Sequence, residues 1–507
     1  MKRLLIGVVA LSAACVWVSK RVDIENVDLG RVTVVKYAAK AHLKDGSTVV
    51  YRDGFTVAGA ELRGAGIRYD LTLGTGTRVD SLPIDAILGM ESFRTRVNVA
   101  QSFIVSTLTS IGTFFGSAVL AIAIFGSCPT IYSGDDEVEE AELFSSSIAP
   151  LFEGRDLDRL RAQPDGSGTL RLDVRNEAME THYINHLQLI EVEHTRDEFV
   201  LPDAQGRPLV VRDLRAGENV TDRAGRDARE KVGAADNIFY ATDQGRIDAA
   251  TAADMDDWLD LTAAVAPGAD SVVVVLRARN SLLGTVLLYD VMLAPGGAAA
   301  LDWVSGDLGT IATAVELGRW HSRRAGLHIS IWQDGAYREV ARVPDSGPIS
   351  WHDVAAVIPV RRGDTSVRLR LSFLADHWRI DRLRLASVSR PATLRTIDAA
   401  DITESDGRSA ADPLASVRRP DDRYLQTTPG QRFFARFDVG VRPGPRTFLL
   451  ASQGYYTEWI RGAWIKQAKA AEPFVPTDES LLVALRRWSQ QRATFEPRFL
   501  AARVPVH

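Results

Sequence analysis

The chain has 507 residues, of which 46% are hydrophobic and 25% charged, and its formal net charge is −5. This composition is typical of a globular protein with about three domains, and the near balance of charge argues against a nucleic-acid partner. The two cysteines, Cys15 and Cys128, exclude a disulfide framework and a cysteine-based zinc site in the globular part.

Residues 1–18 have the features of a signal peptide or a lipoprotein-type anchor. Lys2 and Arg3 precede an apolar run, residues 4–14, that is shorter than a membrane span. Small residues then precede Cys15, as at a bacterial lipoprotein cleavage site, although Ser12 stands where a branched residue is usual. Two interpretations stay open: a lipid anchor on Cys15, or an uncleaved apolar anchor in which this cysteine has no chemical role.

Residues 19–96 predict a small β-barrel. Short runs of β-forming residues alternate here with turn pairs such as Asp45-Gly46 and Asp53-Gly54. Strands at this spacing favour a five-stranded barrel of roughly SH3-like size.

Residues 97–127 predict a transmembrane helix. No charged residue occurs between Arg96 and Asp135, and residues 103–125 are long enough to cross a bilayer. Gly112 and Gly116 would suit close packing against another helix. The alternative is a buried helix of a soluble domain. Loop charges favour a C-terminal part outside the cytoplasm, although an export signal at the N-terminus would already place residues 19–95 there.

The rest of the chain is expected to be mainly β. We expect a β-rich domain at 128–300, a jelly-roll-like β-sandwich at 301–390, and a β-rich element with a C-terminal helix at 391–507. Alternation of apolar and polar residues predicts strands at 169–175, 327–332 and 337–343, the last two joined at Asp334-Gly335. In the C-terminal helix, Thr477 is the expected N-cap and residues 481–488 hold an apolar stripe expected to pack on the sandwich.

Three groups of residues are candidate sites of chemistry. The loop at residues 343–348 has a faint similarity to the nucleophile loop of trypsin-like proteases, with His321 and Asp302 as conceivable partners, but Pro344 and Pro348 replace the glycines needed there. We expect a simple strand-connecting turn. His182, His186 and His194 would stand too far apart on a strand to share a metal, since four strand residues span about 13 Å.

The third group is an acidic cluster around Trp258, consisting of Asp254, Asp256, Asp257 and Asp260, which lacks the EF-hand spacing. A solvated acidic turn is the favoured interpretation. We therefore expect no catalytic residue, metal ligand or cofactor.

Four tryptophans, Trp320, Trp332, Trp351 and Trp378, are spread over the expected sandwich. On one face they could form an aromatic surface that stacks on sugar rings. The commoner role of such residues is to fill the core.

The segment Ser127-Cys128-Pro129-Thr130-Ile131-Tyr132-Ser133, directly after the apolar stretch, resembles a motif of a bacterial envelope protein family of uncharacterised activity. The resemblance extends over most of residues 127–461. It implies a membrane span before the cysteine and a long β-rich exterior region, but no activity. Ser133-Gly134-Asp135 departs from the Asp-Gly that usually follows the Tyr-Ser pair.

These observations together favour a non-enzymatic protein of the bacterial cell envelope, with its C-terminal bulk periplasmic or extracellular. It would act as a scaffold or accessory subunit, in contact with membrane lipid and another envelope or integral membrane protein. The alternatives are a glycan-binding surface module and, third, a hydrolase.

Overall fold

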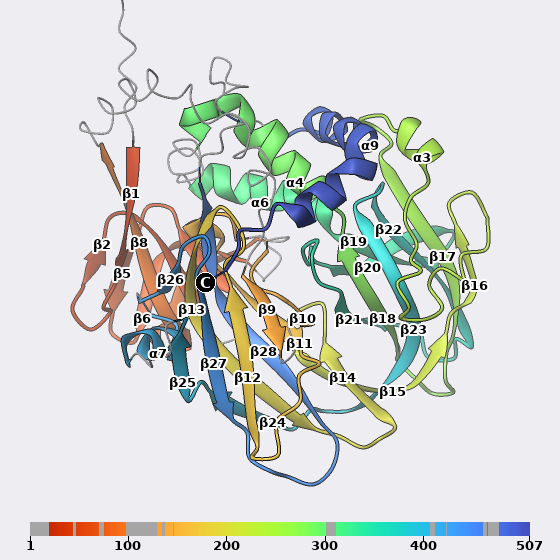
Figure 1. Ribbon diagram of the computed structural model, residues 1–507, viewed down its shortest axis with the longest axis horizontal. Helices are drawn as coiled ribbons and strands as arrows, with labels where there is room; N and C mark the ends of the chain where they lie inside the picture. The colour runs from red at the N-terminus through yellow and green to blue at the C-terminus, as the bar shows by residue number, and fades with distance from the viewer. Residues whose placement is uncertain are drawn as a thin grey trace, which may run out of the picture.

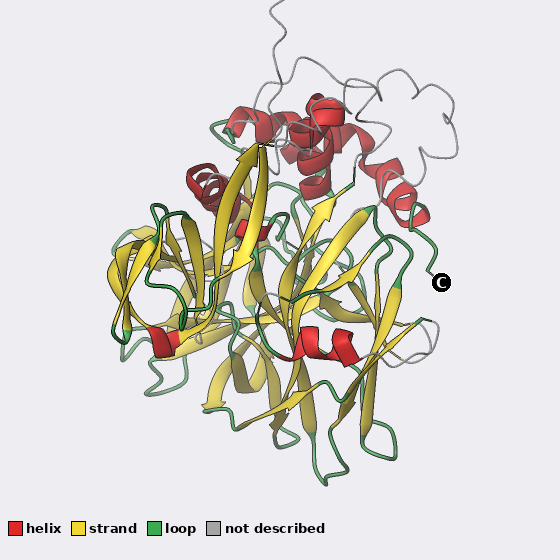
Figure 2. Ribbon diagram, turned by 90° about the vertical axis from the view of Figure 1, so that its left-hand side faces the viewer, coloured by secondary structure: helices red, strands yellow, loops and turns green. Residues whose placement is uncertain are grey.

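The computed structural model describes residues 20–43, 47–69, 76–97, 129–133, 137–145, 147–300, 311–405, 411–421, 423–459, 464 and 476–506. These residues form antiparallel sheets with a group of helices at one end (Figures 1 and 2). The predicted predominance of β-structure is therefore confirmed. The proposed anchor with Cys15, and the proposed membrane helix with Gly112 and Gly116, lie outside the described residues, as does Cys128.

The N-terminal part is one eight-stranded antiparallel sheet, in the order β1-β8-β3-β4-β6-β5-β2 with β7 paired to β6. Among the described residues no pairing joins β1 to β2, so the expected five-stranded barrel is found as a larger sheet that these pairings do not close. The strands are β1 (Lys20–Asn26), β2 (Val34–Val35), β3 (Ala38–Leu43), β4 (Thr48–Tyr51), β5 (Phe55–Ala58), β6 (Glu61–Tyr69), β7 (Gly76–Pro83) and β8 (Ile87–Val97), with the short helix η1 (Ile84–Ala86) before β8.

The first sandwich joins two distant parts of the sequence. Its sheets have the orders β10-β9-β12-β27-β25 and β11-β28-β13-β24, with β26 paired to β13. Side chains such as Leu172, Leu189 and Phe437 form its core. The strands are β9 (Thr130–Ser133), β10 (Glu137–Glu142), β11 (Gly154–Arg159), β12 (Thr169–Arg175), β13 (Glu180–Glu193), β24 (Leu394–Asp398), β25 (Asp401–Glu404), β26 (Leu425–Thr427), β27 (Arg432–Asp438) and β28 (Arg446–Glu458).

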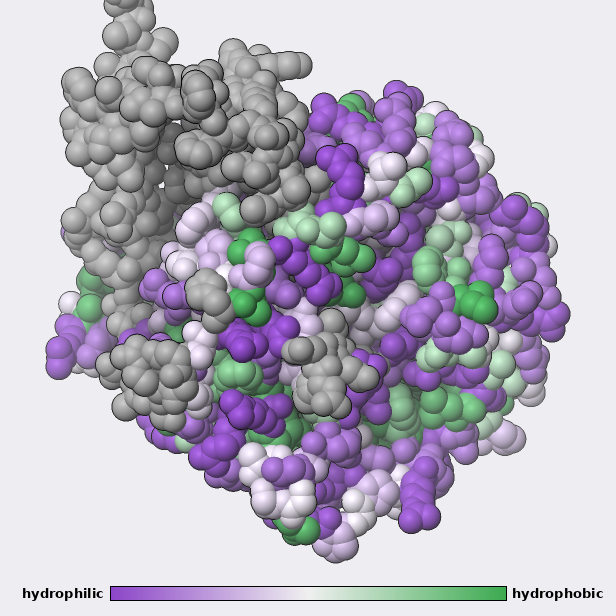
Figure 3. Space-filling view, in the orientation of Figure 1, coloured by the Kyte–Doolittle hydropathy of each residue, from purple (hydrophilic) through white to green (hydrophobic). Residues whose placement is uncertain are grey.

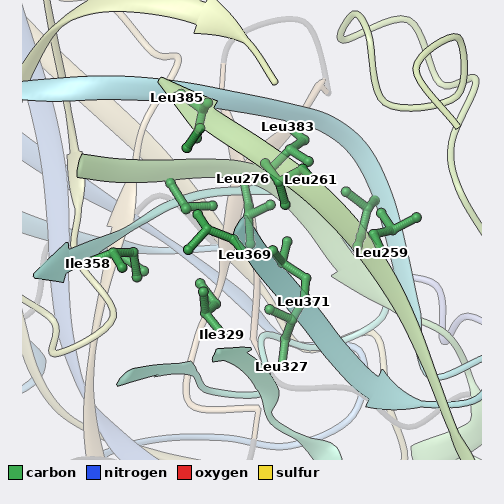
Figure 4. Packing of buried hydrophobic residues seen from close by; sticks show 14 of the residues in the cluster. Leu259, Leu261, Leu276, Leu327, Ile329, Ile358, Leu369, Leu371, Leu383 and Leu385 are labelled. Carbon is green, nitrogen blue, oxygen red and sulfur yellow. The ribbon is translucent and has the colours of Figure 1, made fainter. Parts of the chain in front are cut away.

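The second sandwich is inserted between β13 and β24 of the first. Its sheets have the orders β14-β15-β23-β18-β21 and β16-β17-β22-β19-β20, and leucines and isoleucines from both meet in its core (Figure 4). The strands are β14 (Glu198–Pro202), β15 (Pro208–Ala216), β16 (Glu218–Asp222), β17 (Asp256–Ala264), β18 (Ser271–Asn280), β19 (Leu327–Gln333), β20 (Ala336–Val343), β21 (His352–Pro359), β22 (Ser366–Leu374) and β23 (Trp378–Arg390).

The expected sandwich at 301–390 thus covers only the later strands of this unit. Each sheet pairs early strands with late ones, for example β17 with β22 and β18 with β23. Because alternation within one strand does not reveal its partner, the sequence could not place the beginning of the sandwich near residue 198.

The helices gather at one end of the molecule (Figure 2). They include α3 (Gln244–Asp248), α4 (Leu283–Val286), η3 (Leu287–Leu293), η4 (Ala294–Ala299), α6 (Ile311–Ala325) and α9 (Asp478–Ala501), whereas η2 (Pro150–Phe152) and α7 (Ala411–Arg418) belong to the first sandwich region. No helix in the described ranges has the length and apolar character that a bilayer crossing requires. In the view of Figure 3, hydrophilic residues cover most of the described surface.

Helix α9 confirms the expected cap, because Thr477 Oγ1 accepts a hydrogen bond from the Ser480 N–H at 3.2 Å. Its stripe, including Leu485 and Trp488, packs in a cluster formed largely by the other helices. The expected packing on a sandwich face is corrected accordingly, since helices between β18 and β19 cover that end of the sheets.

Candidate binding cavity

A cavity of about 300 Å³ lies where the N-terminal sheet, both sandwiches and the helices meet. Lys40 reaches it from β3, and the segment from Glu142 to Arg159 lines it from the first sandwich. The second sandwich contributes the loop between β20 and β21, and α4, η3 and α6 close another side. Every large unit of the described fold therefore takes part in shaping this space.

An acid–histidine pair joins the two sandwiches in the cavity wall. His352, the first residue of β21, has its Nδ1 atom 3.0 Å from Oδ1 of Asp158 on β11. Burial by itself lowers the pKa of His352, but the hydrogen bond to Asp158 and the nearby carboxylates of Glu142 and Asp156 outweigh burial and raise this pKa. The pair therefore favours an imidazolium beside a carboxylate.

Asp156 lies two residues before Asp158 on β11, so both side chains are on the same face of the strand. Burial and repulsion from Asp158 raise the pKa of Asp156 to about 7, against the opposing effect of a hydrogen bond from the Phe144 N–H. A carboxyl group with this pKa exchanges a proton near neutral pH.

A second cluster surrounds Asp345, in the loop between β20 and β21. Its Oδ1 atom lies 3.3 Å from Nε2 of His377, and its Oδ2 atom lies 3.5 Å from Nε2 of His321 on α6. Burial would raise the pKa of Asp345, but the two histidines lower it overall. The pKa of His321 is lowered, chiefly by burial.

The same loop is fixed by Asn280 at the end of β18. Its Oδ1 atom accepts hydrogen bonds from the Ser346 N–H at 2.8 Å and the Gly347 N–H at 3.0 Å. Gly347 has a φ of +87°, and a Cβ atom there would lie 2.6 Å from the Glu142 carboxylate. The loop does connect two strands as expected, and it also holds Asp345 in the cavity wall. Of its conceivable partners, His321 is close by, and Asp302 lies outside the described residues.

Several buried polar atoms of the wall have no hydrogen-bond partner among the described residues. They are Asp158 Oδ2, Asn280 Nδ2, His352 Nε2 and His377 Nδ1. Leaving such a group unsatisfied costs about 1–3 kcal/mol, and buried polar groups in proteins are as a rule hydrogen-bonded. The wall therefore offers both donors and acceptors for a polar molecule.

Two of the four predicted tryptophans, Trp320 and Trp378, are buried and line this cavity. Trp332 instead lies on β19 with 39% of its surface exposed. Trp351 packs against Phe239, with ring centroids 5.7 Å apart. The structure thus distributes the four indoles over three places instead of one face.

The three histidines considered for a metal lie outside the cavity. His182 is buried with its Nε2 atom 3.2 Å from Glu180 Oε2, whereas burial lowers the pKa of His186 to about 4. His194 contacts Thr447 Oγ1 at 3.0 Å. Within the described ranges no group of three or more potential ligand residues is arranged to hold a metal ion.

The acidic cluster also divides into separate interactions. Asp254 forms an ion pair with Arg223, and Asp260 forms one with Arg370. Asp257 is buried on β17 and accepts hydrogen bonds from two hydroxyl groups, those of Tyr240 and Thr242. The expected solvated turn is therefore corrected for Asp256, Asp257 and Asp260, which belong to strand β17.

Comparison with known proteins gives little further information. No family model matches the chain, and no curated protein does. Among solved structures, the C-terminal CBM6 of LamC, a marine laminarinase from Zobellia galactanivorans, aligns with 39% of this chain and 99% of its own length. The identity is 11% and the TM-score 0.15, values too low to carry an argument about fold or function.

Proposed function

We propose that this protein binds a small, uncharged, hydroxyl-rich molecule of the sugar class in the cavity. The observation that carries this proposal is the set of unpartnered donors and acceptors in the wall, above all Nδ1 of His377 and Nδ2 of Asn280, whose residues are 3% and 2% exposed. A volume of about 300 Å³ falls at the lower end of the range for small-molecule sites.

The charge of the wall argues for an uncharged ligand. The carboxyl groups of Glu142, Asp158 and Asp345 line the cavity together with the cations Lys40, Arg155 and Arg159, so a ligand of either charge would meet repulsion from part of the wall. A purely apolar ligand would leave the polar atoms unsatisfied. A hydroxyl group both donates and accepts, and it can therefore pair with a carboxylate oxygen on one side and an amide or imidazole nitrogen on another. Trp320 and Trp378 add indole surface to the same wall.

Hydrolysis is a second candidate function, favoured by one observation. Asp156, with its pKa raised to about 7, lies on the same strand face as Asp158, which is paired with His352. Such a carboxyl group can act as a general acid or base at neutral pH. We keep binding as the main proposal, because hydrolysis would in addition require a bond of the ligand to lie within reach of Asp156.

We also retain, as a proposal from the sequence alone, attachment to the bacterial cell envelope and contact with a membrane-protein partner. A scaffold or accessory role would be compatible with a sugar-binding cavity. Its support is the uncharged stretch at 97–127 and the possible lipid anchor at Cys15.

Isothermal titration calorimetry of the full chain in mild detergent tests the main proposal. The panel contains neutral monosaccharides and disaccharides, glucuronate as an anionic sugar, and cyclohexanol as a mainly apolar ring. We expect a neutral sugar to bind and His377→Ala to weaken that binding about tenfold, the effect of losing about 1.4 kcal/mol. His194→Ala, which changes a histidine outside the cavity, is the control and should bind normally. Absence of binding by every neutral sugar, or equal binding by His377→Ala, would contradict the proposal.

A further inference from the structure

The outer face of the sheet β16-β17-β22-β19-β20 carries a continuous row of guanidinium groups and aromatic rings. The Arg370 guanidinium lies 4.3 Å from the ring centre of Trp258 and 4.1 Å from that of Tyr337. The Tyr337 and Trp332 rings are 5.0 Å apart. The complete row, in order of contact, is Arg223, Trp258, Arg370, Tyr337, Trp332 and Arg368.

The alternation of the strands explains why this row faces outward. Leu259 and Leu261 of β17, and Leu369 and Leu371 of β22, point into the core of the second sandwich (Figure 4). Because successive side chains of a strand point to opposite faces, the residues between them emerge on the outer face. The row crosses from β17 to β20, three strand spacings or about 14 Å, on a rigid support.

The charges in the row are not compensated equally. Arg370 forms two hydrogen bonds of 2.8 Å with Asp260, and Arg223 forms two of 2.9 Å with Asp254. Arg368 is exposed and takes part in no ion pair with another described residue. Its guanidinium lies 5.0 Å from the ring centre of Trp332. One end of the row therefore combines an exposed indole with an uncompensated positive charge.

We propose that this face binds an acidic polysaccharide. Sugar rings would lie along Trp332, Tyr337 and Trp258, and a carboxylate of the polymer would pair with Arg368. Arginine suits this contact because its planar guanidinium recognises a carboxylate through two hydrogen bonds and also stacks on aromatic rings. The length of the row fits a polymer better than a single sugar, and the site is separate from the cavity.

A nucleic acid fits this face less well. Its phosphates are spaced a few ångströms apart along each strand, and Asp254, Asp260 and Glu339 lie on or beside the row. A polymer whose charges are separated by neutral ring surface avoids these carboxylates. The near balance of charge over the whole chain supports the same choice.

Affinity electrophoresis and calorimetry on the full chain test this proposal, with polygalacturonate as the acidic probe and dextran as the neutral one. We expect polygalacturonate to bind with an affinity that falls as salt is added. Trp332→Ala should weaken binding at least tenfold, and Arg368→Gln should weaken binding of polygalacturonate specifically. Trp459→Ala is the matched control, because Trp459 is 40% exposed and Trp332 is 39% exposed, and it should bind like the wild type.

Circular dichroism and thermal unfolding of each variant show that the fold is intact. Normal binding by His377→Ala would separate this surface from the cavity, so that either proposal can fail alone. The proposal is overturned if polygalacturonate does not bind, if Trp332→Ala and Arg368→Gln bind it normally, or if a single-stranded oligonucleotide binds more tightly with the same dependence on both residues.

Discussion

His352 of the second sandwich lies 3.0 Å from Asp158 of the first, so a charged pair connects the two units at the cavity wall. Glu142 forms a second connection, because its carboxylate accepts hydrogen bonds from the backbone N–H groups of Ile349 and Ser350. The geometry of the cavity therefore depends on the contact between the sandwiches, and changes at this contact are expected to affect stability and binding together.

The first prediction concerns this pair. His352→Gln should destabilise the protein by about 3–5 kcal/mol, because it leaves the buried Asp158 carboxylate without its cationic partner. The double variant Asp158→Asn/His352→Gln should recover part of this loss, since no unpaired charge remains. Urea unfolding of the wild type, the single variants His352→Gln and Asp158→Asn, and the double variant measures both effects. A double variant whose loss equals the sum of the single losses would show that the two residues do not interact.

The second prediction concerns the effect of pH through Asp156. Its pKa in the folded protein is about 7, above the value of about 3.9 expected in the unfolded chain. The unfolded state therefore loses this proton first as the pH rises, and the stability that the protonated group provides is lost between about pH 4 and pH 7.

Asp156→Asn removes this contribution. The difference in unfolding free energy between pH 5 and pH 8 should become smaller in the variant by about 2 kcal/mol. Urea unfolding at both pH values measures it, with the exposed Asp270→Asn as the control. An unchanged pH dependence in Asp156→Asn would contradict the assignment.

The third prediction concerns the attachment of α9. Asp376 is fully buried, and it accepts hydrogen bonds from Trp488 Nε1 at 2.7 Å and from Arg379 Nη1 at 2.7 Å. Trp488→Phe keeps most of the ring volume but removes one donor, so we expect a loss of about 1–3 kcal/mol. Because His377 follows Asp376 directly, ligand binding should also weaken. Thermal unfolding and calorimetry test this, and normal stability of Trp488→Phe would count against the role of this hydrogen bond.

The fourth prediction concerns the N-terminal cap of the same helix. Thr477→Ala removes the acceptor for the Ser480 N–H and should cost about 1 kcal/mol, whereas Thr477→Ser keeps the hydroxyl and should be close to neutral. Chemical unfolding distinguishes the two variants. Equal stability of Thr477→Ala and Thr477→Ser would contradict the assigned cap.

Local features of the fold could be predicted from the sequence. The β19–β20 hairpin is an example, because Asp334 and Gly335 adopt φ values of +53° and +84°, as expected for an Asp-Gly turn between alternating strands. Strand β12 has the predicted bounds, 169–175. These features depend on neighbouring residues alone.

The cavity could not be predicted because its residues are brought together by the tertiary fold. Asp158 and His352 are 194 positions apart, and no spacing rule connects them. From the sequence, the loop that holds Asp345 looks like a plain turn. His377 lies in the turn between β22 and β23, which belong to different sheets, and its position therefore depends on how those sheets are assembled. The sequence pointed to only a few cavity residues: His321, as a conceivable partner of that loop, and Trp320 and Trp378, as members of a possible aromatic surface.

The insertion of the second sandwich between β13 and β24 has a consequence for biosynthesis. Strand β13 pairs over almost its whole length with β28, which ends at Glu458. On the ribosome, β13 therefore leaves the exit tunnel long before its partner is made, whereas the inserted unit is complete once residue 390 has emerged. Since domains tend to fold as they are synthesised, the second sandwich is expected to fold first. Until β28 has been made, the early strands of the first sandwich have unpaired edges, which a chaperone would have to protect.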